Sequence, residues 1–119
     1  SAKPDMNVYG INSCDQCRKA RKWLQQQAID FGWIDVREQG LQPETVKRWL
    51  DRLGAETLVN RRSATWRMMP LDQRPTLHGA GLVDALLAKP TLIKRPLFER
   101  DTEVRAGFDE RVRQWLKPQ

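Results

Sequence analysis

The feature that most constrains the fold of this chain is a change of hydrophobic pattern within its first 36 residues. Residues 6–10 form a short apolar run that ends at Gly10, and residues 31–36 alternate as a second strand would. Between them, residues 15–27 place apolar side chains three and four positions apart, which is typical of an amphipathic helix. This order predicts two parallel strands joined by a right-handed helical crossover.

The rest of the chain predicts helices followed by a hairpin and a last helix. Pro43 is well placed to begin a helix, and Gly54 is well placed to end it. The later predicted elements are short helical pieces over 56–69, a helix over 79–88, strands at 97–100 and 103–105, and a helix after Gly107-Phe108. The predicted fold class is α/β, in the order β-α-β, helices, then β-β-α.

Composition limits the class of protein. The chain has 119 residues, 39% of them hydrophobic, which suits one globular domain. Its two cysteines exclude a scaffold held by several disulfides, and its single histidine leaves a four-ligand zinc site dependent on carboxylates or a second chain. No apolar run approaches the ~20 residues that cross a bilayer, and the first residues do not resemble a signal peptide. We therefore expect a cytoplasmic protein without a membrane partner.

The positive charge of the chain is spread out. Lys and Arg number 21 against 15 Asp and Glu, which gives a net charge of +6. The basic residues recur in pairs and form no continuous tract, and no recognition-helix motif is present. We expect a solvated basic surface or anionic small-molecule ligands, and we do not expect nucleic acid as a partner.

The strongest chemical signal is the pair Cys14-x-x-Cys17, which lies where the first strand passes into the first helix. A helix N-terminus favours the thiolate, which is the reactive form of cysteine, and the nearby Arg18 and Lys19 would add to this effect if they approach. Cys14 is then the nucleophile, and Cys17 can resolve a mixed disulfide. The alternatives are two buried structural thiols or half of an intermolecular metal site.

Two basic segments are further candidates. Arg95, which precedes Pro96 and the hairpin, offers a planar fork for an oxyanion or a carboxylate. Arg61 and Arg62 form a pair that could collect an anion near Cys14. In both segments the simpler interpretation is solvated surface charge.

Several separated motifs resemble the arsenate reductase (ArsC) family, particularly its YffB-like branch. They are Tyr9-Gly10-Ile11-x-x-Cys14-Asp15-x-x-Arg18-Lys19-Ala20-Arg21-Lys22-Trp23-Leu24, Leu58-Val59-Asn60-x-Arg62-Ser63-x-Thr65-Trp66-Arg67, Ile93-Lys94-Arg95-Pro96 and Gly107-Phe108. The resemblance extends over nearly the whole chain. It implies a single thioredoxin-like domain over residues 1–119 with a helical insertion at about residues 40–88.

The resemblance also assigns roles to residues. It implies that Cys14 is the nucleophile, that Arg95 holds the oxyanion and that Pro96 follows a cis peptide bond. Arg61 or Arg62 matches a further anion-binding arginine, and we include Asn12, in the loop before Cys14, among the substrate-binding residues.

The function implied is that of a thiol-disulfide oxidoreductase, specifically a glutathione-dependent thiol reductase with glutathione as co-substrate and no metal. The third arginine of true arsenate reductases is missing, because Ala106-Gly107-Phe108 stands there with Arg105 only nearby. Arsenate reduction is therefore an alternative. Cys17 resembles the Spx branch, redox-sensing regulators that bind RNA polymerase, which is a second alternative. We expect a monomer whose partners are glutathione or another thiol or disulfide substrate, with glutaredoxin as a further candidate.

Overall fold

The computed structural model describes residues 4–118, which fall into two compact units. The first unit combines the two ends of the chain, up to residue 39 and from residue 95 onward. The second unit comprises residues 40–94. The domain expected from the sequence covers both units, and its residues 1–3 and 119 lie outside the described residues.

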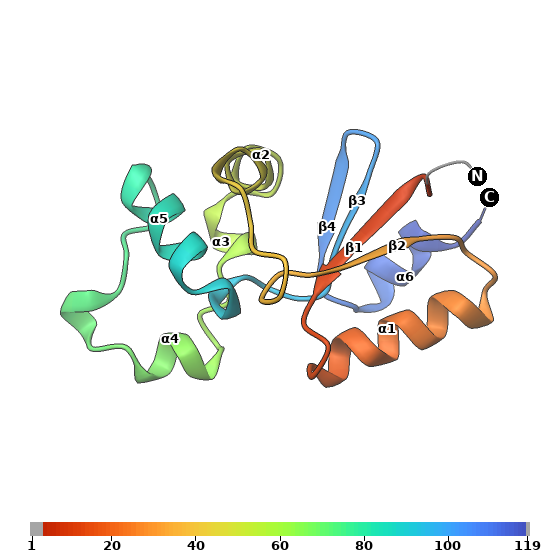
Figure 1. The fold of residues 1–119 in the computed structure, drawn as a ribbon, viewed down its shortest axis with the longest axis horizontal. Coiled ribbons are helices and arrows are strands. Elements are labelled where there is room, and N and C mark those ends of the chain that lie inside the picture. The colour runs from red at the N-terminus through yellow and green to blue at the C-terminus, as the bar shows by residue number, and fades with distance from the viewer. Residues whose placement is uncertain (1–3, 119) are drawn as a thin grey trace. The chain divides into compact units, whose positions relative to one another are not determined.

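The first unit is built on a four-stranded sheet (Figure 1). Its strands are β1 (Met6–Gly10), β2 (Gly32–Asp35), β3 (Leu97–Arg100) and β4 (Glu103–Ala106), in the order β2-β1-β3-β4. β1 pairs in parallel with β2, as the crossover pattern predicts, and antiparallel with β3. β3 and β4 form the expected hairpin, whose turn residue Asp101 has a φ of 54°.

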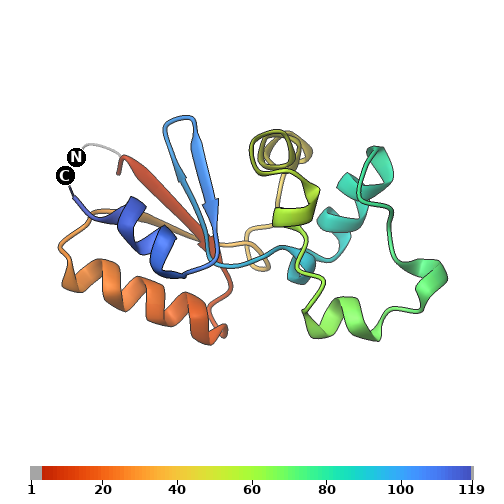
Figure 2. The same ribbon diagram turned by 180° about the vertical axis from the view of Figure 1, so that it is seen from behind.

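Two helices pack on one face of this sheet, α1 (Asp15–Gln26) and α6 (Glu110–Leu116) (Figures 1 and 2). Successive residues of a strand point to opposite sides of a sheet, and paired residues point to the same side. Val8 pairs with Phe98, so both apolar side chains lie on the face that the helices cover. The core cluster contains Met6, Val8, Ala20, Leu24, Phe98, Val112 and Leu116. Trp23 and Trp115 are partly buried and pack against this cluster.

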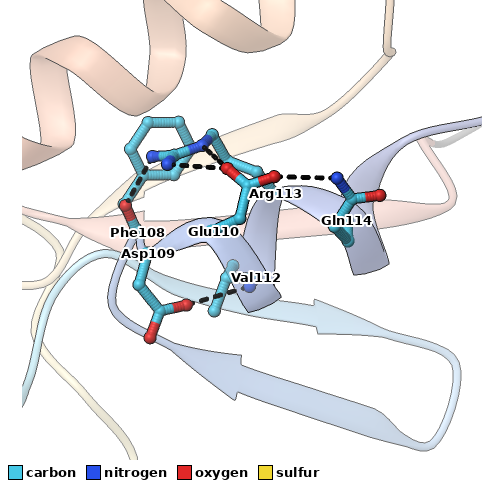
Figure 3. A network of polar contacts seen from close by, with 6 residues as sticks. All are labelled: Phe108, Asp109, Glu110, Val112, Arg113 and Gln114. Carbon is cyan, nitrogen blue, oxygen red and sulfur yellow. Dashed lines mark hydrogen bonds and ion pairs between the residues drawn. The ribbon is translucent and has the colours of Figure 1, made fainter.

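Polar contacts hold the start of α6 (Figure 3). The Asp109 carboxylate accepts a hydrogen bond from the Val112 backbone N–H at 3.0 Å, which caps the helix. The Arg113 guanidinium donates to the carbonyl oxygen of Phe108 and to the carboxylate of Glu110, and it lies 5.2 Å from the centroid of the Phe108 ring. Gln114 also donates to Glu110. These contacts keep Phe108 against the core.

The second unit is helical. It contains α2 (Pro43–Leu53), α3 (Ala55–Leu58), α4 (Ala64–Met68), the 3₁₀ turn η1 (Leu71–Gln73), α5 (Ala80–Ala88) and the 3₁₀ turn η2 (Pro90–Leu92). Pro43 begins α2, and Gly54, with a φ of 82°, ends it, as predicted. Trp49 and Leu86 are fully buried in this unit. An isolated antiparallel bridge joins Val59, which follows α3, to Ile93, which follows η2.

The α/β class and the thioredoxin-like order of elements predicted from the sequence are confirmed. The second strand is shorter than predicted, because the backbone of Val36 leaves the ladder after donating its N–H to the carbonyl of Gly10. Among the described residues, no helix is both long and apolar enough to cross a membrane.

Candidate functional site

Cys14 is the N-cap residue of α1. Its backbone is extended, with φ −81° and ψ 125°, and its carbonyl accepts the first helical hydrogen bond, from the Arg18 N–H at 3.0 Å. The Cys14 N–H donates to the carbonyl of Ile11, which folds residues 11–14 into a tight turn after β1. The side chain is partly buried and its thiol is free. The turn therefore presents Cys14 at the end of the sheet.

The surroundings of Cys14 favour its thiolate. Partial burial would raise the pKa of Cys14, but the Cys17 backbone and thiol and the Arg95 guanidinium all interact with the sulfur and lower it, so the net pKa lies below the ordinary value. Arg18 forms an exposed pair with Asp15. The cation that stabilises the thiolate is thus Arg95 rather than the neighbouring residues of α1.

Cys17 has the opposite character. It is fully buried one helical turn beyond Cys14, and burial together with the negative charge of Cys14 raises its pKa to about 12. It stays protonated at neutral pH and can donate a hydrogen bond to the Cys14 sulfur. The two thiols therefore differ in reactivity: Cys14 favours the nucleophilic thiolate, and Cys17 remains a protonated thiol.

Gly10 leaves the space that the Cys17 sulfur occupies. A Cβ atom added at Gly10 would lie 2.4 Å from Cys17 Sγ and 2.8 Å from the Trp33 ring. Glycine at this position is consequently a condition for placing Cys17 against the end of β1. Sequence reasoning interpreted Gly10 only as the end of a strand.

We expect Gly10→Ala to destabilise the protein by about 1–3 kcal/mol, because the methyl group overpacks the space shared with Cys17 and Trp33. Urea unfolding measures this loss. Gly81→Ala is the matched control: Gly81 lies in α5 with no atom within 4 Å of an added Cβ, so alanine should be neutral or stabilise by up to about 1 kcal/mol. Equal unfolding midpoints for Gly10→Ala and the natural protein would contradict the expected clash.

Asp35 anchors the loop that precedes Cys14. Its side chain is 4% exposed, yet its carboxylate accepts three backbone hydrogen bonds, from Asn12 at 2.7 Å, Arg37 at 2.8 Å and Glu38 at 3.0 Å. The bond from Asn12 ties the loop after β1 to the end of β2. A hollow of about 360 Å³ lies beside this loop, lined by Ile11, Asn12, Ser13, Asp35, Arg37 and Glu38. Sequence reasoning missed Asp35, and its position near the end of the predicted second strand is the signal that could have indicated it.

Asn12 binds a tryptophan whose ring lies near Gly10 and Cys17. Its Oδ1 accepts a hydrogen bond from Trp33 Nε1 at 2.8 Å, and the far edge of the Trp33 ring faces Gly10. The Arg21 guanidinium stacks over the same ring, with its centre 4.3 Å from the ring centroid. Asn12 itself is exposed. Besides being a candidate contact to substrate, it thus has a structural partner that its sequence position did not indicate.

Arg95 and Pro96 lie at the entrance to β3. The peptide bond between them is cis, as the resemblance implied. Pro96 is buried, and its carbonyl accepts a hydrogen bond from the Gly107 N–H at 2.8 Å. Arg95 is partly buried and is the cationic residue that interacts with Cys14. The predicted grouping of Cys14, Cys17 and Arg95 is therefore present within the first unit.

Arg61 and Arg62 belong to the second unit, between α3 and α4. Both are exposed, and the Arg62 N–H donates to Asn60 Oδ1 at 3.1 Å. They line a hollow of about 430 Å³ together with Glu56, Thr57, Val59, Asn60 and Lys94. The hollow has the positive charge that an anion requires. The predicted action of this pair on a ligand of Cys14 remains a prediction.

The residues from 4 to 118 place no cluster of three His, Cys, Asp or Glu side chains where they could hold a metal ion. The groups that meet at Cys14 are a poised thiolate, a neighbouring thiol and a guanidinium. These groups suit nucleophilic attack on sulfur and stabilisation of an anion.

Comparison with solved structures agrees with this arrangement. A YffB protein superposes with a TM-score of 0.87 at 30% identity, covering 95% of this chain and 99% of its own. An arsenate reductase (ArsC) related protein from Brucella melitensis gives a TM-score of 0.77 at 35% identity, covering 97% of this chain and 96% of its own. Both likenesses extend over the sheet unit and the helical unit.

Sequence comparison gives the same grouping. An uncharacterised protein of Haemophilus influenzae is 36% identical over 106 residues, which are 89% of this chain and 93% of that protein. The global transcriptional regulator Spx of Lactiplantibacillus plantarum is 30% identical over 112 residues, covering 92% of this chain and 84% of the regulator. The sequence profile of the ArsC family matches residues 9–114. With its sheet, its poised cysteine and this match along most of its length, the chain belongs to the ArsC family.

Proposed function

We propose that this protein is a thiol-disulfide oxidoreductase, specifically a glutathione-dependent thiol reductase with Cys14 as the nucleophile. The observation that supports this best is the contrast between the two thiols. The pKa of Cys14 is lowered beside Arg95, whereas burial raises the pKa of Cys17 to about 12. A resolving thiol that stays protonated cannot compete with Cys14 for the first attack.

The proposed reaction exchanges disulfides in two steps. The Cys14 thiolate attacks the glutathione sulfur of a mixed disulfide, the S–S bond breaks, and the substrate sulfur leaves as a thiolate that takes a proton from water. Cys14 is then joined to glutathione. A second glutathione thiolate attacks this bond and leaves as oxidised glutathione, which regenerates Cys14. The net reaction converts the mixed disulfide and one reduced glutathione into the substrate thiol and one oxidised glutathione.

Cys17 offers a second route for the last step. Deprotonated Cys17 attacks Cys14 in the mixed disulfide, glutathione leaves as a thiolate, and an internal disulfide forms. The charge of the Cys14 thiolate is one cause of the raised pKa of Cys17, and that charge is absent once Cys14 is bonded to glutathione. Burial, the larger cause, still opposes deprotonation. We propose that external glutathione competes with this internal route.

The binding roles follow the anionic character of glutathione, which has two carboxylates. We propose that Arg95 and the Arg61–Arg62 pair orient these groups, with Asn12 and Pro96 contacting the ligand near Cys14. We also propose action as a cytoplasmic monomer, with glutaredoxin as a candidate partner that removes glutathione from Cys14. The two free cysteines suit the proposed cytoplasmic location, because the cytosol keeps thiols reduced.

Arsenate reduction is a weaker proposal. The Brucella melitensis relative described as arsenate reductase related gives it some support. Arg105, the arginine nearest the third family position, is occupied elsewhere: it donates to the Val104 carbonyl and Glu103, and its guanidinium centre lies 4.9 Å from the Trp115 ring centroid. An arsenate-dependent oxidation of glutathione above background would restore this alternative.

A redox-sensing regulator is the second alternative, supported by the 30% identity to Spx and by the Cys14-x-x-Cys17 pair. It differs from the enzyme in two measurable ways. A regulator of this kind binds RNA polymerase differently in its oxidised and reduced states, and it does not turn over glutathione mixed disulfides. A pull-down in both redox states, beside a turnover assay, separates the two proposals.

Mass spectrometry after incubation with oxidised glutathione tests the enzymatic proposal. We expect Cys17→Ser to accumulate one glutathione on Cys14 and to retain turnover in the presence of reduced glutathione, because a second glutathione molecule replaces the internal thiol. The natural protein should divide between this adduct and the internal disulfide. The proposal fails if Cys17→Ser forms no adduct, or forms one that reduced glutathione cannot remove.

A further inference from the structure

Arg21 is held beside the active-site loop by two successive contacts. Its guanidinium stacks over the Trp33 ring at 4.3 Å, and Trp33 Nε1 donates to Asn12 Oδ1 at 2.8 Å. Asn12 lies two residues before Cys14. We call Arg21, Trp33 and Asn12 together the Arg21 shelf. Through the Trp33 ring and the Asn12 amide, the Arg21 shelf connects the Arg21 guanidinium to the loop that precedes Cys14.

Arg21 has no anionic partner among residues 4–118. No carboxylate of these residues forms an ion pair with it, and its Nε is buried without a hydrogen-bond acceptor. By contrast, Arg18 pairs with Asp15 and Arg113 pairs with Glu110. Arginine has five N–H donors in a fixed plane, which suit a carboxylate. A guanidinium that is already ordered, and whose donors are not used by the protein, loses little further freedom when it binds an anion.

Arg21 lies on the same side of α1 as the two cysteines. Cys14, Cys17 and Arg21 are spaced three and four residues apart, which places them along one stripe of the helix. The separation of residues 14 and 21 along the axis is about 10 Å at 1.5 Å per residue, and helical side chains lean back toward the N-terminus. A shallow hollow lined by Arg18, Arg21, Lys22 and Gln25 adjoins this stripe. Its lining is basic, with no acidic residue.

We propose that Arg21 binds a carboxylate of the glutathione whose sulfur is joined to Cys14. The sulfur of glutathione lies on its central residue, so a terminal carboxylate lies roughly 7 Å or more from it when the tripeptide is extended. The Arg21 side chain leans back from its axial position, about 10 Å beyond Cys14, and so comes within this reach. The stack on Trp33 holds the guanidinium in one plane, so the shelf recognises a planar carboxylate and not merely negative charge. This inference rests on the proposed function and deepens it, because it identifies a residue that selects glutathione over uncharged thiols.

The experiment compares two disulfides in the Cys17→Ser background, where the adduct on Cys14 accumulates. Oxidised glutathione has carboxylates and bis(2-hydroxyethyl) disulfide has none, so a carboxylate site affects only the first. We expect Arg21→Gln to slow formation of the glutathione adduct about five- to tenfold and to change the hydroxyethyl adduct less than twofold. Arg21→Lys should restore part of the rate, since a point charge lacks the planar fork.

Lys19→Gln is the matched control. Lys19 is an exposed residue of α1, so this change removes the same unit of charge from the same helix without touching the shelf. We expect Lys19→Gln to alter neither rate by more than twofold. Equal slowing of the glutathione adduct by Lys19→Gln and Arg21→Gln would overturn the inference in favour of net charge. Equal slowing of both disulfides by Arg21→Gln, or of neither, would also overturn it.

The failure of the proposed function has a different signature. If the glutathione adduct forms faster than the hydroxyethyl adduct and depends on Arg21, but reduced glutathione never releases it, then the carboxylate site stands and the reductase proposal fails. If the Cys17→Ser protein turns over with glutathione and adding Arg21→Gln leaves the adduct rates unchanged, the reductase proposal stands. The Arg21 shelf then does not bind the glutathione carboxylate. If the Cys17→Ser protein forms an adduct with neither disulfide, both the reductase proposal and the carboxylate site at Arg21 fail.

Discussion

Replacement of Cys14 by serine is expected to reduce disulfide-exchange turnover to the background level, a loss of about three orders of magnitude or more. A serine hydroxyl is not ionised at neutral pH, whereas the structure lowers the pKa of the Cys14 thiol. Cys17 cannot take over, because it is buried and its pKa is raised to about 12. Turnover of a glutathione mixed disulfide by the natural protein and Cys14→Ser measures the effect.

The pH dependence of Cys14 alkylation tests the cause of this reactivity. Because the thiolate is the reacting form and its pKa is lowered, the rate with iodoacetamide should rise as pH increases and reach half its maximum at a lower pH than it does for the same thiol in the unfolded chain. The same protein in urea provides the control, with a midpoint near the free value. Arg95→Gln should move the midpoint of the folded protein upward. A midpoint at or above that of the unfolded chain would contradict a poised thiolate.

Asp35→Ala is expected to destabilise the protein by about 3 kcal/mol, at about 1 kcal/mol for each of the three part-buried hydrogen bonds that its carboxylate accepts from backbone N–H groups. Asp35→Asn retains one acceptor oxygen and should lose less. Urea unfolding measures both variants. Asp30→Ala is the matched control, since Asp30 lies exposed just before β2, and it should change the free energy of unfolding by less than about 0.5 kcal/mol. A similar small change for Asp35→Ala would show that the loop does not depend on this carboxylate.

The same carboxylate predicts a dependence of stability on pH. Burial alone would raise the pKa of Asp35, but the hydrogen bonds from Asn12, Glu38 and Arg37 outweigh it and the pKa is lowered. The folded pKa therefore lies below the unfolded value of about 3.9. The stabilisation by Asp35 is complete above the unfolded value and is lost as pH falls through the folded value. The stability difference between the natural protein and Asp35→Asn should accordingly narrow below about pH 4.

Local patterns determined most of the architecture of this protein. The change from a strand pattern to helical spacing predicts β1, α1 and the position of Cys14 between them, because hydrophobic periodicity is set by neighbours in the chain. Pro43 and Gly54 likewise define α2 through their own backbone preferences. The motif resemblance added the thioredoxin-like class and the cis bond before Pro96, which no local pattern indicated.

Only the tertiary structure decided how the site works. It placed Arg95, about 80 positions from Cys14, against the sulfur, while the adjacent Arg18 turned to Asp15. It also brought β2 beside β1, which put Asp35 under the loop, and Trp33 against Gly10 and Arg21. Such contacts depend on strand pairing and packing between distant segments, and periodicity within one segment contains no information about them.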